Sequence, residues 1–230
     1  MERETIYING VDIAGLGVKA LRDYRIGGTE ITNYEWQGTN RSQFLNLFSK
    51  YGLKQLDFTL VFTGTRRRNV EEMRSRVTMM LYGISEIRMP DEFTYRCLLD
   101  SVGEGEWQGQ EGNGWLLFVP YTLRGIQHDA LVTVPDGRTR FYVEATLPQM
   151  DACLTVRVST AASQYVLAGA TFGAVAAGDV LVFDGINKRI LKNGAPTTAT
   201  GYFEFPCVKH GWNLFTALDA VQVDYYPCYL

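Results

Sequence analysis

Three glutamates in a glycine-rich stretch are the residues that most resemble a paired-carboxylate site. Glu104, Glu106 and Glu111 all lie within residues 103–114. A glycosidase holds two such carboxylates in a rigid cleft, which separates their pKa values and so assigns one as acid and one as base. A glycine-rich segment is too flexible to fix that geometry. We therefore interpret this stretch as a solvated, mobile loop or a hairpin arm.

A second candidate is the glycine pair Gly15 and Gly17, which superficially matches the start of a dinucleotide-binding pattern. That chemistry needs a helix that begins at the glycines, so that its amides face the pyrophosphate. Residues 18–26 are instead strand-like in composition. A β-turn is therefore the better interpretation of the two glycines.

The thiols and imidazoles are too few and too scattered to form a reactive or metal-binding site. The chain contains Cys97, Cys153, Cys207, Cys228, His128 and His210, with no CxxC pair. Zinc sites use closely spaced ligand pairs, and no nucleophile elbow, HExxH motif, phosphate loop or calcium loop is present. Cys97 alternates with apolar residues, so we expect it in a core. We expect no catalytic residue, no cofactor and no metal.

One basic cluster stands out, Arg66-Arg67-Arg68. It could contact a nucleic-acid backbone, face an acidic patch on a protein, or form a solvated turn. The net charge of −3 gives no general attraction to nucleic acid or to an anionic membrane. Three adjacent like charges gain most when acidic surface faces them. A solvated turn is the leading interpretation, a protein partner is the next, and nucleic acid is the last.

The length of the chain and its first residues limit the classes of protein to which it can belong. A length of 230 residues allows one or two domains. No apolar run approaches the roughly 20 residues that span a bilayer. The charged start Met1-Glu2-Arg3-Glu4 lacks the apolar stretch of a signal peptide. We therefore expect no membrane partner and synthesis in a cytoplasm.

The first half of the chain predicts strands and one helix. Leu56, Phe58, Leu60 and Phe62 alternate with Asp57, Thr59, Val61 and Thr63, which is typical of a half-buried strand with one core face. Residues 69–82 place apolar side chains at helical spacing, with Asn69 as N-cap, Glu72 at the capping-box position and Gly83 as the stop. The apolar face comprises Val70, Met73, Val77, Met80 and Leu81.

The strands that follow this helix predict both a fold and an interface. Residues 84–89 and 93–99 read as strands around a Pro90-Asp91 turn, which favours an α+β sandwich. Residues 115–123 are apolar on both faces, so this strand is either fully buried or covered by a neighbouring subunit. We therefore place a protein interface at the arginine cluster, the glycine-rich arm and this strand, comprising Arg66, Arg67, Arg68, Trp107, Trp115 and Leu117.

The second half predicts an all-β module. A linker between residues 124 and 138 leads into short alternating strands near 141–147, 154–158, 179–184, 188–192, 202–205, 213–218 and 221–226. Asp184-Gly185 and Asn193-Gly194 are hairpin turns, because glycine accepts positive φ. The late aromatic residues either fill the core or offer sugar-stacking platforms. We expect an N-terminal module over 1–129 and a β-sandwich over 130–230.

These elements, in this order, resemble the distal tail protein (Dit) family of long-tailed phages and prophages. In the first half the resemblance rests on the strand LDFTLVFTG (56–64), the helix, and the turn into PDEFTYRC (90–97). In the second half it rests on GDVLVFD (178–184), KRILKNG (188–194), HGWN (210–213) and YYP (225–227). The order and spacing of these pieces, more than any one motif, carry the similarity.

The resemblance implies a structural protein of the virion and no enzyme. It implies that the N-terminal modules form a six-membered ring at the end of the tail tube, assembled in the bacterial host cytoplasm. The implied partners are further copies of the chain, the tail-tube and tape-measure proteins, a tail-associated lysin or fibre hub, and receptor-binding proteins. The second module would be galectin-like. Two alternatives stay open: another tail-tube-type protein, and a carbohydrate-binding module with weak glycan binding.

Overall fold

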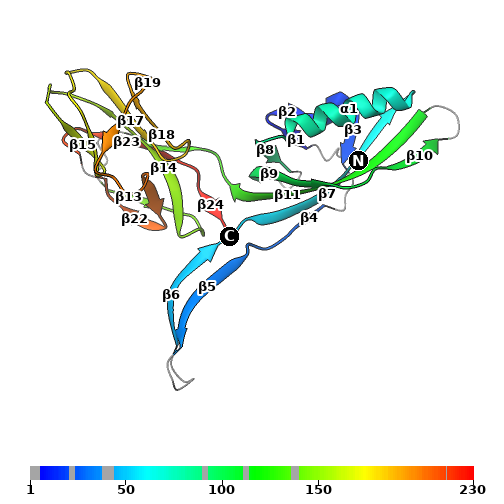
Figure 1. Ribbon diagram of the computed structural model, residues 1–230, viewed down its shortest axis with the longest axis horizontal. Coiled ribbons are helices and arrows are strands. Elements are labelled where there is room, and N and C mark those ends of the chain that lie inside the picture. The colour runs from blue at the N-terminus through cyan, green and yellow to red at the C-terminus, as the bar shows by residue number, and fades with distance from the viewer. Residues whose placement is uncertain are drawn as a thin grey trace. The chain divides into compact units, whose positions relative to one another are not determined.

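The chain folds into two compact units, each with its own apolar core. Figure 1 shows the computed structural model, which describes residues 6–20, 24–37, 44–89, 93–110, 114–135, 140–215 and 217–230. Unit 1 comprises residues 1–128 with Leu230, and unit 2 comprises residues 129–229. Strands dominate both units, and the described residues contain one α-helix. The predicted mainly-β fold with a single helix is confirmed.

Unit 1 is built on an antiparallel sheet. Its strands are β1 (Tyr7–Ile8), β2 (Val11–Asp12), β3 (Val18–Ala20), β4 (Arg25–Ile26), β5 (Ile31–Gln37), β6 (Phe44–Tyr51), β7 (Lys54–Gly64), β8 (Ile84–Arg88), β9 (Thr94–Val102), β10 (Glu106–Gln110) and β11 (Gly114–His128). The sheet order is β2-β1-β8-β9-β11-β7-β3, with β10 also paired to β11 and β4 to β7. Strands β5 and β6 pair with each other in a separate two-stranded sheet.

Strands β7 and β11 form the centre of this sheet, and their alternation explains its core. The side chains at 56, 58, 60 and 62 are all buried, as the period of two predicts. On β11, Leu117, Val119, Tyr121 and Leu123 are buried, whereas Leu116 and Phe118 on the other face are only half-buried. The linker expected from residue 124 is wrong for residues 124–128, because β11 stays paired with β9 as far as His128.

Helix α1 (Arg67–Met80) lies along one face of the unit 1 sheet (Figure 1). All five predicted apolar positions join the core of unit 1, with Val70 and Val77 fully buried. The predicted N-cap is wrong by three residues, since Arg66 is the N-cap and Asn69 lies inside the first turn. Gly83 has the left-handed φ of +78° just beyond the helix, as expected of a stop signal.

Two predicted loops of unit 1 contain regular structure. Of the two interpretations of the glycine-rich stretch 103–114, the hairpin arm is confirmed, because β10 within it pairs with β11; residues 111–113 lie outside the described residues. Gly15 lies in a single 3₁₀ turn, η1 (Ile13–Leu16), which ends at Gly17 with φ +77°. A strand follows rather than a helix, so the turn offers no pyrophosphate-binding helix start.

Unit 2 is a β-structure of several sheets around one core. Its strands are β12 (Val132–Val134), β13 (Phe141–Val143), β14 (Gln149–Arg157), β15 (Tyr165–Leu167), β16 (Ala170–Phe172), β17 (Val180–Asp184), β18 (Arg189–Lys192), β19 (Ala195–Pro196), β20 (Ala199–Thr200), β21 (Cys207–Lys209), β22 (Gly211–Asn213), β23 (Val221–Tyr225) and β24 (Cys228–Tyr229). The largest sheet has the order β12-β23-β14-β17-β18-β19, with β21 on β14. Strands β13 and β22 form a pair, and β15, β16 and β20 a three-stranded sheet.

The turns of unit 2 are held by short polar side chains. Asn193 and Gly194 both have positive φ between β18 and β19, so this predicted hairpin turn is confirmed. The predicted turn at Asp184-Gly185 is also present, between the antiparallel strands β17 and β18. Gly185 does not have positive φ, however, and its role is close approach, because a Cβ there would meet the carbonyl oxygen of Ala152 at 2.7 Å. A backbone hydrogen bond from Ala176, aided by neighbouring side chains, lowers the pKa of Asp179 from 3.8 to about 2.

Two segments of unit 2 that the sequence predicts as strands, 202–205 and 213–218, are not continuous strands in the described part of the chain. Residues 202–205 form a bend in which Tyr202 and Phe205 pack against Phe183 of the core while Phe203 is fully exposed. In the predicted strand 213–218, only Asn213 belongs to a strand among the described residues. The late aromatic residues are therefore divided between the core and the surface.

Candidate protein-interaction surfaces

The three predicted arginines cluster at the start of helix α1, and all three are exposed. Arg66 is the N-cap residue and makes no capping hydrogen bond with its side chain. Arg68 pairs with Glu72 one turn further on, at 3.0 Å between Nε and Oε1. This exposed pair contributes little, about 0.3–0.5 kcal/mol. Glu72 is therefore an ion-pair partner rather than the capping-box residue that the sequence predicts.

Arg67 joins the arginines to the two predicted tryptophans. Its guanidinium carbon lies 4.0 Å from the ring centroid of Trp115 and 5.2 Å from that of Trp107. The two indoles meet edge to face at 6.1 Å, and both pack against the core of unit 1. A cation over an indole face is worth about 0.5–1 kcal/mol at an exposed site. The arrangement fixes the first turn of α1 onto strands β10 and β11.

The electrostatics of this helix start are unfavourable within the isolated chain. A helix N-terminus carries a partial positive charge, so cations in its first turn are disfavoured by about 0.3–1 kcal/mol each. Neither Arg66 nor Arg67 has an ion pair within the described part of the chain. An acidic surface on a partner would relieve this repulsion.

Leu117 does not belong to this surface. It pairs with Trp107 across β10 and β11, but its side chain is fully buried in the core of unit 1. The alternation that made β11 look apolar on both faces gives one core face, which includes Leu117, and one half-exposed face with Leu116 and Phe118. We therefore leave Leu117 out of the proposed interface, as a correction to the sequence prediction.

The sequence analysis missed an exposed apolar surface on the β5–β6 hairpin of unit 1. Strands β5 and β6 form a hairpin whose described apolar side chains are exposed on both faces, including Ile31 at 51% and Leu47 at 62%. Tyr34 and Phe48 stack across the hairpin with ring centroids 4.3 Å apart. The available signal was the segment FLNLF at 44–48, in which four of five residues are apolar. A two-stranded hairpin alone is marginal in water, so it calls for a covering surface.

A second apolar patch lies on the main sheet of unit 1. Ile84 of β8 and Leu98 of β9 are directly paired, and they are 64% and 48% exposed. Directly opposed side chains form one continuous contact surface. Unit 1 thus presents two different apolar surfaces, the β5–β6 hairpin and the Ile84–Leu98 patch.

Neither a metal-ion cluster nor a reactive buried thiol is found among the described residues. No group of three or more His, Cys, Asp or Glu side chains among them is placed to hold a metal ion. None of the four cysteines is in a disulfide. Burial raises the pKa of both Cys97 and Cys153 to about 12, so these thiols stay protonated and unreactive at neutral pH. No helix in the described part of the chain is long and apolar enough to cross a membrane.

Comparison with solved structures identifies the fold. The Dit protein (gp 19.1) of phage SPP1 superposes with a TM-score of 0.66 over 100% of both chains, at 12% sequence identity. The chain shares the fold of the SPP1 Dit protein. Two structures of the activated phage p2 baseplate, with Ca and with Sr, contain similar chains with TM-scores of 0.56 and 0.57 at 98% and 97% coverage and 10–11% identity. Neither family models nor curated protein sequences give a match to the chain.

Proposed function

We propose that this chain is a structural hub protein of a phage tail tip. It would form a ring at the end of the tail tube and connect the tube to the tail-associated and receptor-binding proteins. The observation that carries this proposal is the match of the whole chain, over both units, to a protein described as a paradigm of the hub adsorption apparatus in phages that infect Gram-positive bacteria. The chain would then act in the virion, after assembly in the host cytoplasm, and would catalyse no reaction.

The two apolar surfaces of unit 1 support ring formation. A closed ring needs a heterologous interface, in which two different surfaces of each subunit meet. The β5–β6 hairpin and the Ile84–Leu98 patch are two such surfaces, and both expose apolar side chains that water disfavours. In the proposed ring, the hairpin of one copy lies on the neighbouring copy. We propose six copies, as in the family that the sequence resembles.

The arginines at the start of α1 are proposed to lie near an interface between subunits or with the tube. The net charge of −3 means that neighbouring copies can supply acidic surface. Each exposed charge pair is weak, about 0–1 kcal/mol, but a ring repeats it at every interface. The contact would therefore tune assembly rather than drive it, and salt would weaken it.

The mass of the assembled protein tests the proposal. Analytical ultracentrifugation and negative-stain electron microscopy of the purified chain should find closed rings of about six times the 25.9 kDa subunit mass. A monomer at tens of micromolar, both alone and with a tail-tube protein, would contradict the proposal. Open-ended tubes of this chain alone would favour the alternative of a tail-tube protein.

A further inference from the structure

The described residues of unit 2 line an open cleft. The cleft has a volume of about 770 Å³, within the range of specific binding sites. Its floor is the edge of the core, where the rings of Phe141 and Tyr225 stack with centroids 6.3 Å apart beside Val134. These floor residues are all nearly buried, so the cleft opens directly onto apolar core rather than onto a polar surface.

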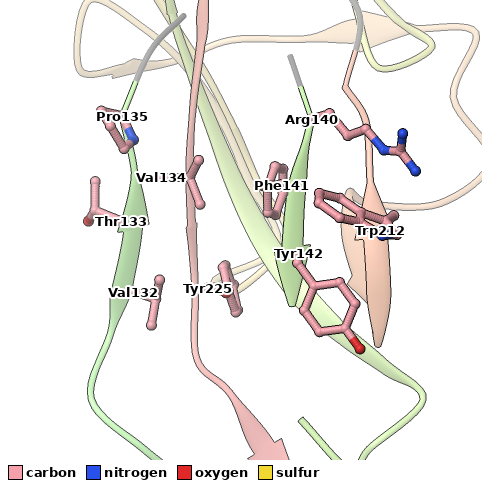
Figure 2. Close-up of a pocket in the computed structure, with 9 residues that line it drawn as sticks. All are labelled: Val132, Thr133, Val134, Pro135, Arg140, Phe141, Tyr142, Trp212 and Tyr225. Atoms are coloured by element: carbon pink, nitrogen blue, oxygen red, sulfur yellow. The ribbon is translucent and has the colours of Figure 1, made fainter. Parts of the chain in front are cut away.

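The rim of the cleft is an ordered aromatic and cationic cluster. Figure 2 shows Arg140 beside Trp212, with Tyr142 next to them. The Arg140 guanidinium carbon lies 4.4 Å from the centroid of the Trp212 ring, and Tyr142 meets that ring edge to face at 5.4 Å. The pairing of β13 with β22 places Tyr142 directly opposite Trp212. Although Trp212 is 61% exposed, these contacts hold it in one orientation, which lowers the entropy lost on binding.

The charge at the rim favours an acidic ligand. Within the described part of the chain, Arg140 has no ion pair. Stacking on the indole holds the guanidinium plane in place and leaves its N–H groups for a carboxylate. Trp, Tyr and Arg are also the residue types that contribute most at protein–protein interfaces.

The lining distinguishes a peptide from a sugar. A neutral sugar needs several acceptors and donors for its hydroxyl groups, but the described residues that line the cleft include no carboxylate or amide side chain. The hydroxyl of Thr133 is already donated to Asp224, at 2.6 Å. An aliphatic or proline side chain, by contrast, finds an apolar floor. Strand β12 at the cleft pairs only with β23 among the described residues, so its other edge can receive an extended backbone.

We propose that this cleft binds an extended segment of another protein, with an aliphatic or proline side chain on the Phe141–Tyr225 floor and a carboxylate at Arg140. The cleft lies wholly in unit 2 and uses none of the surfaces assigned to the ring. The inference therefore goes beyond the proposed function and stands even if the ring does not form.

A library of short random peptides, displayed on a surface and selected on the purified full chain, tests this proposal. We expect the retained peptides to carry Asp or Glu next to aliphatic residues or proline. One synthetic peptide from the selection, and its Asp→Asn or Glu→Gln form, would then be titrated by calorimetry. Arg140→Ala should weaken binding up to about fivefold, the range of an exposed charge pair, and Trp212→Ala roughly thirtyfold, the range of an interface hot spot.

Reversing the charge at Arg140 distinguishes most clearly between an acidic ligand and other ligands. Because Arg140 is exposed, Arg140→Glu should leave the fold intact, lose the acidic peptides and select Lys- or Arg-containing ones. The control variants Arg157→Ala and Phe203→Ser, which change an exposed cation and an exposed ring of unit 2 outside the cleft, should bind like the wild type. Equal binding by the Arg140→Glu and wild-type proteins, or retention of sugars from a glycan panel but of no peptide, would overturn the proposal.

Discussion

Removing apolar surface from the β5–β6 hairpin should break the proposed ring without unfolding the subunit. The variant Ile31→Thr with Leu47→Thr replaces two exposed side chains that lie outside the Tyr34–Phe48 stack. Threonine is a good strand former, so the hairpin itself should persist. Full burial of an aliphatic side chain is worth about 1.5–3 kcal/mol. With 51% and 62% of the two side chains exposed, an interface that buries them loses about 2 kcal/mol in the variant, since threonine keeps one methyl group.

That loss corresponds to roughly a thirtyfold weaker contact between neighbouring subunits. Sedimentation velocity over a dilution series should therefore show the variant dissociating at about thirtyfold higher subunit concentration than the wild type, with an unchanged melting temperature. Phe203→Ser, which removes an exposed ring from unit 2, is the matched control and should assemble normally. Equal assembly of the hairpin variant and the wild type at every concentration would refute the role of the hairpin.

Three further outcomes are expected. Replacing the arginines at 66–68 with serine should weaken assembly more at low salt than at high salt, while the monomer stays folded, as measured by sedimentation in both buffers. If the variant assembles like the wild type in both buffers, the arginines form only a solvated turn. Gly125→Ala would overlap the Cys97 sulfur and should lower the free energy of unfolding by about 1–3 kcal/mol, whereas Gly109→Ala faces open space and serves as the control in urea titrations. Because the pKa of Asp179 is depressed from 3.8 to about 2, its contribution to stability is present above pH 3.8 and is lost as the pH falls toward 2. The melting temperature of Asp179→Asn should therefore converge with that of the wild type over this range, and a constant difference would contradict this role.

The elements that the sequence predicted well are those with a regular apolar period. Strand β7 has an apolar residue at every second position from Leu56 to Phe62, and α1 places five apolar residues on one face, so each pattern admits one structure. The ends of α1 were harder, because capping is a local preference that tertiary contacts can override. Arg67 stacks on Trp115, which lies 48 positions away in the chain, and this contact accompanies a helix start ahead of Asn69.

The interaction surfaces were the least predictable part. The β5–β6 hairpin exposes apolar side chains on both faces, so it lacks the alternation that marks a half-buried strand. Leu117 and Leu116 have the same side chain, yet only the strand register shows which of them faces the core. In unit 2, residues 202–205 have the composition of a strand, but Phe203 points fully outward. The composition of a segment shows how many apolar residues it contains, but it does not show whether a core or a partner covers them.

The position of the chain in the virion tests the account most directly. Antibodies raised against the purified chain, linked to gold and applied to intact tailed particles that carry it, can be located by electron microscopy. We expect the gold to be confined to the tip of the tail, at the end of the tube. Gold distributed along the tail tube or on the head would contradict the claim that this chain is the tail-tip hub.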